Sequence, residues 1–318
     1  MTTVGAALDE ATLALRTSGS ETARLDAELL VGLVTGRDRT TVIAHPELLL
    51  GAEDVARLRA VVERRAGGEP VAYIRGMKEF YGLILAVDPR VMIPRPETEL
   101  LVERAVEWTV RALTGAPRPA GERRFRIADL ACGSGAVAIA IASVLRTRGF
   151  LDAVEILAAD VSPGAVAVAL ENAVAHGLAD AIQFRVADLY PADAPPVDLL
   201  VANLPYVPSA DLPRLPVAAS FEPALALDGG PDGLAVVRRL LAELPGALTP
   251  GGAAFLEIGE RQAGGVRAAA DDLLPGWSTD VHADLAGMPR VVGLSAVPLP
   301  AAGTAAPVMA PPRPRGRI

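Results

Sequence analysis

The tetrapeptide Asn203, Leu204, Pro205 and Tyr206 comes directly after an apolar run at positions 197–202. An amide nitrogen is a poor nucleophile because its lone pair is delocalised into the carbonyl group. Two acceptors that hold both of its N–H protons, the Asn203 side-chain oxygen and the Leu204 backbone carbonyl, would favour its pyramidalisation during attack on an electrophile. Pro205 would stiffen the turn, and Tyr206 would offer a flat face to a planar amide or base. The turn is therefore a candidate site for chemistry on an amino nitrogen.

A second candidate site is the loop after the apolar run 125–130, which consists of Ala131, Cys132, Gly133, Ser134 and Gly135. The glycines let the backbone pass close to a ligand, and the helix that follows offers free N–H groups to an anion such as a carboxylate. The Gly-x-Gly spacing lacks the third glycine of the dinucleotide-binding fingerprint. On its own, the loop is therefore also compatible with an ordinary strand-to-helix turn.

Acidic residues at the ends of neighbouring strands strengthen the case for a bound adenosine. Asp160 ends the second predicted strand, where its carboxylate can accept hydrogen bonds from both ribose hydroxyls. Asp188 follows the third strand, near the expected adenosine end, and Asp129 can order the glycine loop. A glycine loop after the first strand and an Asn-x-Pro-Tyr turn after the fourth together predict a methyltransferase that acts on nitrogen.

The elements that must position these residues alternate between strand and helix from position 122 onward. Strands are expected at 126–130, 154–159, 182–186, 197–202 and 253–258, with helices at 136–145, 163–176 and 234–244. This alternation predicts an α/β domain with a mostly parallel, doubly wound sheet and helices on both faces. Positions 281–297 are expected to add further strands, including an antiparallel one.

The rest of the chain divides into a helical start, a connector and a tail. Residues 1–70 predict a small helical domain, because apolar residues recur at three- and four-residue spacing over 6–15, 22–34 and 52–66. Residues 71–92 mix aromatic and β-branched side chains with glycine, which predicts a hairpin-like connector. The catalytic domain is expected to span 93–297, and the Ala- and Pro-rich tail 298–318 to be disordered.

Composition narrows the classes of protein and partner. The 318 residues are 51% apolar, enough for one or two cores, and the net charge of −8 disfavours a phosphate-binding surface for nucleic acid. No apolar run is long enough for a membrane span, and the first residues resemble no targeting peptide. The single cysteine suits a reducing cytoplasm, and we also expect a monomer. Cys132 is the single cysteine and the three histidines lack ligand spacing, so neither a disulfide nor a metal site is expected.

These segments resemble the HemK/PrmC family of protein-(glutamine-N5) methyltransferases over nearly all of residues 1–297. Besides the loop and the turn, the resemblance rests on Gly-Glu-Pro-Val-Ala-Tyr-Ile-Arg-Gly at 68–76, Glu-Phe-Tyr at 79–81, Ile-Pro-Arg-Pro-Glu-Thr-Glu at 93–99, Glu-Pro at 222–223, Leu-Asp-Gly-Gly at 227–230 and Leu-Glu-Ile-Gly at 256–259. It implies a class I, Rossmann-like catalytic domain with S-adenosylmethionine as methyl donor. It also implies a helical N-terminal domain that recognises peptide-chain release factors, whose Gly-Gly-Gln loop carries the glutamine that is methylated.

The same resemblance implies roles for single residues. The donor would be contacted by Ala131, Cys132, Gly133, Ser134, Gly135 and Asp160, and its adenine by Asp188 and Leu189. Asn203 would touch both donor and substrate, and the glutamine side chain would be clasped by Asn203, Leu204, Pro205 and Tyr206. Arg95 and Glu97 would order the pocket beside the substrate.

Two positions depart from the family pattern. Leu204 replaces the more usual proline, and Ala131-Cys132 replaces Gly-Thr at the start of the glycine loop. The first change keeps the backbone carbonyl, although it makes the turn less rigid. The second change keeps small residues, so ligand access should survive.

Three other functions remain open from the sequence. Amino-methyltransferases of DNA or RNA bases use the same kind of turn, although they need a cationic groove for an extruded base. A non-catalytic donor-binding protein would have no need of Asn203, Pro205 and Tyr206. An enzyme that methylates the glutamine of another protein cannot be separated by sequence from one that acts on release factors.

Overall fold

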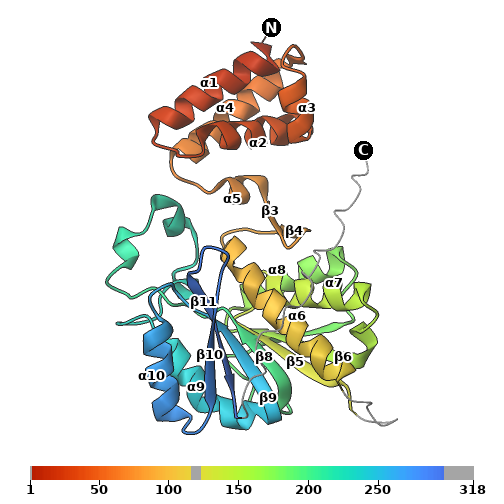
Figure 1. Cartoon of the computed structure of the whole chain (residues 1–318). Coiled ribbons are helices and arrows are strands. Elements are labelled where there is room, and N and C mark those ends of the chain that lie inside the picture. Colours follow the sequence, from red (N-terminus) through yellow and green to blue (C-terminus); the bar gives the residue numbers. More distant parts are fainter. Residues whose placement is uncertain (1, 116–122, 297–318) are drawn as a thin grey trace. The chain divides into compact units, whose positions relative to one another are not determined.

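The computed structural model describes residues 2–115 and 123–296 (Figure 1). The chain divides into two compact units, of which Met1–Met77 with Leu215–Phe221 form the first and Lys78–Arg214 with Glu222–Ile318 form the second. The tail predicted to be disordered, 298–318, lies outside the described residues. Within the described ranges, no helix combines the length and the apolar character that crossing a membrane would require.

The first unit is built mainly from helices. Leu8 and Leu15 of its first helix, Leu30 of the second and Leu58 of the fourth share one buried core. The helices and two short paired strands are α1 (Val4–Thr17), α2 (Ala23–Thr35), α3 (Arg39–Ala44), α4 (Ala52–Ala66), α5 (Val71–Arg75), β1 (Thr2–Thr3) and β2 (Leu49–Leu50). The helices predicted from apolar spacing are confirmed as α1, α2 and α4. The spacing did not predict α3 and α5, which are too short to show a period.

The segment expected to be a hairpin-like connector contains both a helix and a hairpin. Its first residues form α5, and the paired strands β3 (Met77–Phe80) and β4 (Leu83–Ala86) follow. Tyr81 and Gly82 join these strands with φ angles of 51° and 74°, the left-handed geometry of a tight two-residue turn. The hairpin leads the chain into the second unit.

The second unit is organised around a sheet that has seven strands in the described part of the chain. Their order is β10-β11-β9-β8-β5-β6-β7. β5 to β9 run parallel, whereas β10 and β11 are antiparallel to their neighbours. The strands are β5 (Phe125–Leu130), β6 (Val154–Asp160), β7 (Ile182–Val186), β8 (Val197–Ala202), β9 (Leu248–Glu257), β10 (Ser278–Ala283) and β11 (Pro289–Ser295). The predicted mostly parallel sheet is confirmed, including the antiparallel strands near its end.

Helices cover both faces of this sheet (Figure 1). One face is covered by α6 (Glu99–Thr114), α7 (Ala136–Thr147) and α8 (Pro163–Ala175), and the other by α9 (Ala235–Ala247) and α10 (Ala263–Leu273). In β8, Leu199 and Val201 belong to the core between the sheet and α6 to α8, while Leu200 and Ala202 belong to the core between the sheet and α9 and α10. Because both faces are buried, the strand is a continuous apolar run. Three of the helices, α7 to α9, were predicted, and α6 and α10 were not.

The order of the strands reverses between β5 and β8. From β5 the chain continues through β6 to β7 at one edge of the sheet, and it then returns to β8 and continues through β9. In doubly wound sheets, ligands bind beyond the carboxyl ends of the strands at such a reversal. The glycine loop follows β5, Asp160 ends β6 and Asn203 follows β8, so the fold brings all three to that edge.

Candidate active site

A cavity of about 290 Å³ lies at the carboxyl edge of the sheet. The predicted residues on its wall are Ala131, Cys132, Gly133, Ser134, Asp160, Asp188, Leu189, Asn203, Leu204 and Pro205. The described lining of this cavity does not include four other predicted residues, which are Gly135, Tyr206, Arg95 and Glu97. A larger hollow of about 690 Å³ lies at the amino ends of β5 to β8, and its described wall contains none of the predicted residues. The smaller cavity is therefore the candidate site.

The glycine loop adopts backbone conformations that favour glycine. Gly133 and Gly135 have φ angles of +53° and +78°. A Cβ atom at Gly135 would lie 3.0 Å from both Ala169 Cβ and Ile139 Cδ1, whereas one at Gly133 would meet no atom within 4 Å. Ala131 also has a positive φ, 54°, although it is not glycine. The loop thus stays close to α7 and α8 on one side and open toward the cavity on the other.

Two buried carboxylates hold the glycine loop and the helix that follows it. Asp129 Oδ2 accepts a hydrogen bond from Ala138 N at 2.9 Å. Asp160 accepts hydrogen bonds from Gly133 N and Ser162 N, each at 2.9 Å and each through a different oxygen. Burial raises the pKa of both carboxyls, and that of Asp129 reaches about 7. Each Asp160 oxygen retains a second lone pair, so this carboxylate can also accept hydrogen bonds from ligand hydroxyls in the cavity.

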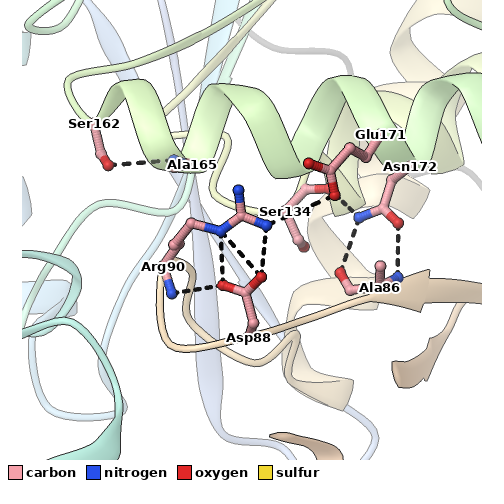
Figure 2. A network of polar contacts seen from close by, with 8 residues as sticks. All are labelled: Ala86, Asp88, Arg90, Ser134, Ser162, Ala165, Glu171 and Asn172. Atoms are coloured by element: carbon pink, nitrogen blue, oxygen red, sulfur yellow. Dashed lines mark hydrogen bonds and ion pairs between the residues drawn. The ribbon is translucent and has the colours of Figure 1, made fainter. Parts of the chain in front are cut away.

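The side chain of Asn172 ties the glycine loop to the hairpin strand β4 (Figure 2). Its Nδ2 donates to the carbonyl oxygens of Ser134 at 2.9 Å and Ala86 at 3.0 Å, while its Oδ1 accepts from Ala86 N at 2.7 Å. Asn172 is only 1% exposed, so these bonds are shielded from water. Sequence reasoning missed this residue, although an asparagine within an apolar helix face is a recognisable signal of a buried polar role.

Arginines at the rim of the cavity are paired with acids. Arg90 donates to Asp88 through Nε at 3.0 Å and Nη2 at 2.6 Å, and its Nη2 lies 3.7 Å from Glu171 (Figure 2). Arg239 Nη2 donates to Asp188 Oδ2 at 2.7 Å. Asp188 is therefore oriented by an arginine while it lines the predicted adenosine end.

In the Asn-Leu-Pro-Tyr turn, the Asn203 amide is held from one side. Its Nδ2 donates to Thr98 Oγ1 at 3.2 Å. Its Oδ1 is buried and has no hydrogen-bond partner within the described part of the chain. Both Asn203 and Thr98 line the cavity. A buried carbonyl oxygen without a partner costs free energy, so this atom is a prime candidate to accept a hydrogen bond from a ligand.

A glycine-rich segment after the turn holds its backbone in place. Val207 N donates to Leu227 O at 2.9 Å, and Gly229 N donates to Val207 O at 2.8 Å. A Cβ atom at Gly229 would lie 2.8 Å from Pro205 O, so only glycine fits this close approach. The segment 227–230, which contributed to the family resemblance, thus supports the turn directly.

The other predicted substrate residues are Tyr206, which ends the turn, and Arg95 and Glu97, which precede Thr98 in the chain. Tyr206 is partly buried, and burial together with the nearby Glu257 raises the pKa of its phenol to about 12. Arg95 pairs with Glu222, a buried carboxylate that also accepts a hydrogen bond from Ile93 N at 3.2 Å. Glu97 is exposed. Arg95 therefore fixes the segment before Thr98 through Glu222, which bonds the backbone of that segment at Ile93.

The residues present fit S-adenosylmethionine. Asp160 offers acceptors for ribose hydroxyls, and the free N–H groups at the start of α7 suit a carboxylate. Burial, together with Asp129 and Asp160, raises the pKa of the Cys132 thiol well above its usual value. That thiol therefore stays protonated, and the site has no cysteine nucleophile at this position.

Comparisons with known proteins give the family. Residues 6–76 match the family model described as PrmC N-terminal domain, and residues 127–220 match one described as Methyltransferase domain. A curated relative from Moorella thermoacetica, named release factor glutamine methyltransferase, is 39% identical over 289 residues, which cover 91% of this chain and 96% of the relative. A relative of the same name from Bradyrhizobium diazoefficiens is 37% identical and covers 89% and 92% of the two chains.

A solved structure supports the fold. The hMettl16 catalytic domain, crystallised in complex with a 3′UTR hairpin, has a TM-score of 0.51 at 15% identity, and the match covers 72% of this chain and 81% of that one. The sheet order, the cavity at the strand reversal and the curated relatives agree. The chain therefore belongs to the release factor glutamine methyltransferase family of S-adenosylmethionine-dependent enzymes.

Proposed function

We propose that this enzyme transfers a methyl group from S-adenosylmethionine to the side-chain amide nitrogen of the glutamine in the Gly-Gly-Gln motif of peptide-chain release factors. The observation that carries the proposal concerns the Oδ1 of Asn203, which lines the cavity. This atom is buried and has no hydrogen-bond partner among the residues that the structure describes. An acceptor in this position suits a substrate that arrives with N–H protons to donate. The curated relatives, named for glutamine in release factors, supply such a substrate.

The donor is held at the carboxyl ends of β5 and β6. Ala131 to Gly135 bring their backbone close to it, Asp160 accepts from its ribose hydroxyls, and Asp188 and Leu189 lie along its adenine. When bound, the donor supplies a methyl group on a positively charged sulfur, which is the electrophile. The protein's contribution is to fix the position of that methyl group in front of the turn at Asn203.

The turn holds the nitrogen that receives the methyl group. Asn203 Oδ1 and the Leu204 carbonyl oxygen accept the two N–H protons of the glutamine amide and direct its lone pair toward the methyl group. Positive charge develops on this nitrogen during the transfer, and these preorganised acceptors stabilise it. Pro205 and Tyr206 complete the clasp, and Arg95 and Glu97 order the segment beside it. The bond between the methyl carbon and the sulfur would break as the carbon–nitrogen bond forms, which would leave a neutral thioether. The nitrogen then loses its extra proton to water, so the site needs no strong base.

The first unit is assigned the docking of the release factor. It contains the residues that match the PrmC N-terminal domain, and none of the predicted site residues lies among its described residues. Release factors act on ribosomes, so the reaction takes place in the cytoplasm. We assign the enzyme a monomeric state and no direct contact with nucleic acid, in keeping with its net charge of −8.

Mass spectrometry of the modified substrate tests the proposal. The purified enzyme is incubated with S-adenosylmethionine and a folded release factor, with the same factor carrying asparagine in place of the Gly-Gly-Gln glutamine, and with short DNA and RNA strands. We expect one methyl group on the glutamine of the unaltered factor and none on the other substrates. Methylation of a nucleobase, or of the altered factor, would overturn the assignment.

A further inference from the structure

The carboxylate of Glu257 lies directly behind the turn at the active site. Glu257 is the last residue of β9, and Leu256 of β9 pairs with Ala202 of β8. Glu257 comes directly after Leu256, and Asn203 comes directly after Ala202. The parallel register therefore places Glu257 and Asn203 side by side. Glu257 is 2% exposed, and its Oε2 has no hydrogen-bond partner in the ranges 2–115 and 123–296. A carboxylate this deeply buried calls for a specific role.

Thr98 connects Glu257 to Asn203. The Thr98 hydroxyl accepts a hydrogen bond from Asn203 Nδ2 at 3.2 Å, and the side chains of Thr98 and Asn203 both hydrogen-bond the Glu257 carboxylate, which can only accept while it is ionised. Thr98 is 4% exposed, and it lines the cavity together with Asn203. The three side chains therefore form one chain of hydrogen bonds, which starts at a buried carboxylate and ends at the cavity.

The carboxylate fixes the direction of this chain. The two ends of the asparagine amide have nearly the same shape, so packing alone hardly distinguishes its oxygen from its nitrogen. An ionised carboxylate can only accept hydrogen bonds, and a hydroxyl has a single proton to donate. When Thr98 donates to Glu257, it must therefore accept from Asn203. This leaves Nδ2 on the Thr98 side and Oδ1 toward the cavity.

We propose that Glu257 is a positioning residue for methyl transfer: together with Thr98 it keeps the Oδ1 of Asn203 facing the nitrogen that is methylated. The inference rests on the proposed function, in which Asn203 Oδ1 accepts a proton of the substrate amide. Glu257 itself touches neither substrate nor donor. Its contribution is to prevent the amide from turning its N–H groups toward the substrate.

The electrostatic surroundings make this chain sensitive to pH. Burial, together with the nearby Glu97, raises the pKa of Glu257 to about 7, although the hydrogen bonds from Thr98 and Asn203 and the charge of Arg290 oppose this shift. The Tyr206 phenol also faces this carboxylate, and it stays neutral because its own pKa is about 12. A protonated Glu257 can donate to Thr98, which then has its own proton free to donate to Asn203. The orientation of the amide is no longer fixed in that state.

The experiment compares full-length variants in single-turnover methyl transfer from about pH 5.5 to about pH 9, with release factor as substrate. Glu257→Gln should lower the maximal rate about tenfold or more. The glutamine amide can donate as well as accept, so it no longer forces Thr98 and Asn203 to donate toward it. The affinity for S-adenosylmethionine and the KM for the release factor should stay within about twofold of the wild type, since neither ligand touches Glu257. The rate of the wild type should rise with pH through about 7, and this rise should be absent in Glu257→Gln.

Matched variants separate positioning from structure. Thr98→Ser keeps the hydroxyl and should keep most of the rate, whereas Thr98→Val keeps the shape and should lose it. Glu260→Gln, an exposed carboxylate near the same strand, should behave as the wild type. If Glu257→Gln fails to fold, the two Thr98 variants test the same chain of hydrogen bonds.

The outcomes distinguish this inference from the proposed function. The positioning role would be overturned if Glu257→Gln kept the full rate and its rate still rose with pH through about 7. It would also be overturned if Thr98→Val and Thr98→Ser had equal rates. If Asn203→Ala loses the rate while these variants keep it, only the positioning role fails. If Asn203→Ala also keeps the rate, the proposed function fails with it.

Discussion

Asn172 Nδ2 donates a 2.9 Å hydrogen bond to the carbonyl oxygen of Ser134, so a residue in the last turn of α8 fixes the loop that is expected to hold the methyl donor. The same amide bonds both backbone groups of Ala86 in the hairpin strand β4 (Figure 2). The hairpin therefore supports the donor loop, although the two are far apart in the sequence.

Replacing Asn172 by Asp tests this support. Aspartate keeps the acceptor for Ala86 N but loses both N–H donors, and the oxygen that replaces Nδ2 then faces the carbonyl oxygens of Ser134 and Ala86. We expect the free energy of unfolding to fall by roughly 1–3 kcal/mol and the donor affinity to fall about tenfold. Urea denaturation and calorimetric titration with S-adenosylmethionine measure the two effects. Glu171→Gln, on the neighbouring exposed position of α8, is the matched control, and equal behaviour of the two variants would contradict the role of Asn172.

Asp160→Ala tests the ribose contact. The variant loses the acceptor for the ribose hydroxyls and also the bond to Gly133 N. Hydrogen bonds to a charged acceptor contribute roughly 1.5–3 kcal/mol each, so the affinity for S-adenosylmethionine should fall at least about tenfold. Asp152→Ala, at an exposed position outside the cavity, serves as the control. An unchanged titration curve for Asp160→Ala would remove this residue from the site.

The left-handed backbone of the glycine loop predicts that substitutions at its two ends change the free energy of unfolding in opposite directions. Ala131→Gly relieves a residue with a φ of 54° and should raise the free energy of unfolding by up to about 1 kcal/mol. Gly135→Ala adds a Cβ atom 3.0 Å from Ala169 and Ile139 at a φ of +78°, and should lower that free energy by about 1–3 kcal/mol. Denaturant titration measures both. Gly246→Ala, where a Cβ atom would meet nothing within 4 Å, is the control for the loss of a glycine.

Asp129 predicts a pH dependence of stability. Burial raises its pKa from 3.8 to about 7 in the folded state, so the folded protein binds this proton more readily than the unfolded chain. The stability that the protonated group contributes is full below about pH 3.8 and is lost as the pH rises toward 7. Asp129→Asn keeps an acceptor for Ala138 N and removes the titration. Relative to the wild type, its free energy of unfolding should increase by roughly 2–4 kcal/mol between about pH 4 and pH 8. A constant difference across that range would contradict the assignment.

Sequence reasoning predicted best the parts of the fold that are buried on all sides. β8 lies between two cores, so its uninterrupted apolar run stands out from the residues around it. α6 was not predicted, although the buried Leu101, Val102, Ala105, Val106 and Thr109 follow a helical spacing that a closer reading could have found. The glycine loop and the turn could be recognised because each combines several informative residues within a short stretch.

The support around the site could not be predicted in the same way. Asn172 bonds a strand that lies 86 positions earlier in the sequence, and Thr98 and Asn203 are 105 positions apart. Glu257 lies within a recognised segment, but its burial follows from the pairing of β9 with β8. Such contacts depend on the three-dimensional path of the chain, which no local pattern contains.

The central claim is that Asn203 acts through its side-chain oxygen, whereas Leu204 acts only through its backbone carbonyl. The most direct measurement is the single-turnover rate of methyl transfer to the release factor with Asn203→Ala and with Leu204→Pro. Asn203→Ala should lower the rate at least about a hundredfold, because it removes an acceptor for the charge that develops on the nitrogen. Leu204→Pro keeps the carbonyl and should lower the rate less than about tenfold. The reverse order of the two rates would contradict the amide clasp proposed for this enzyme.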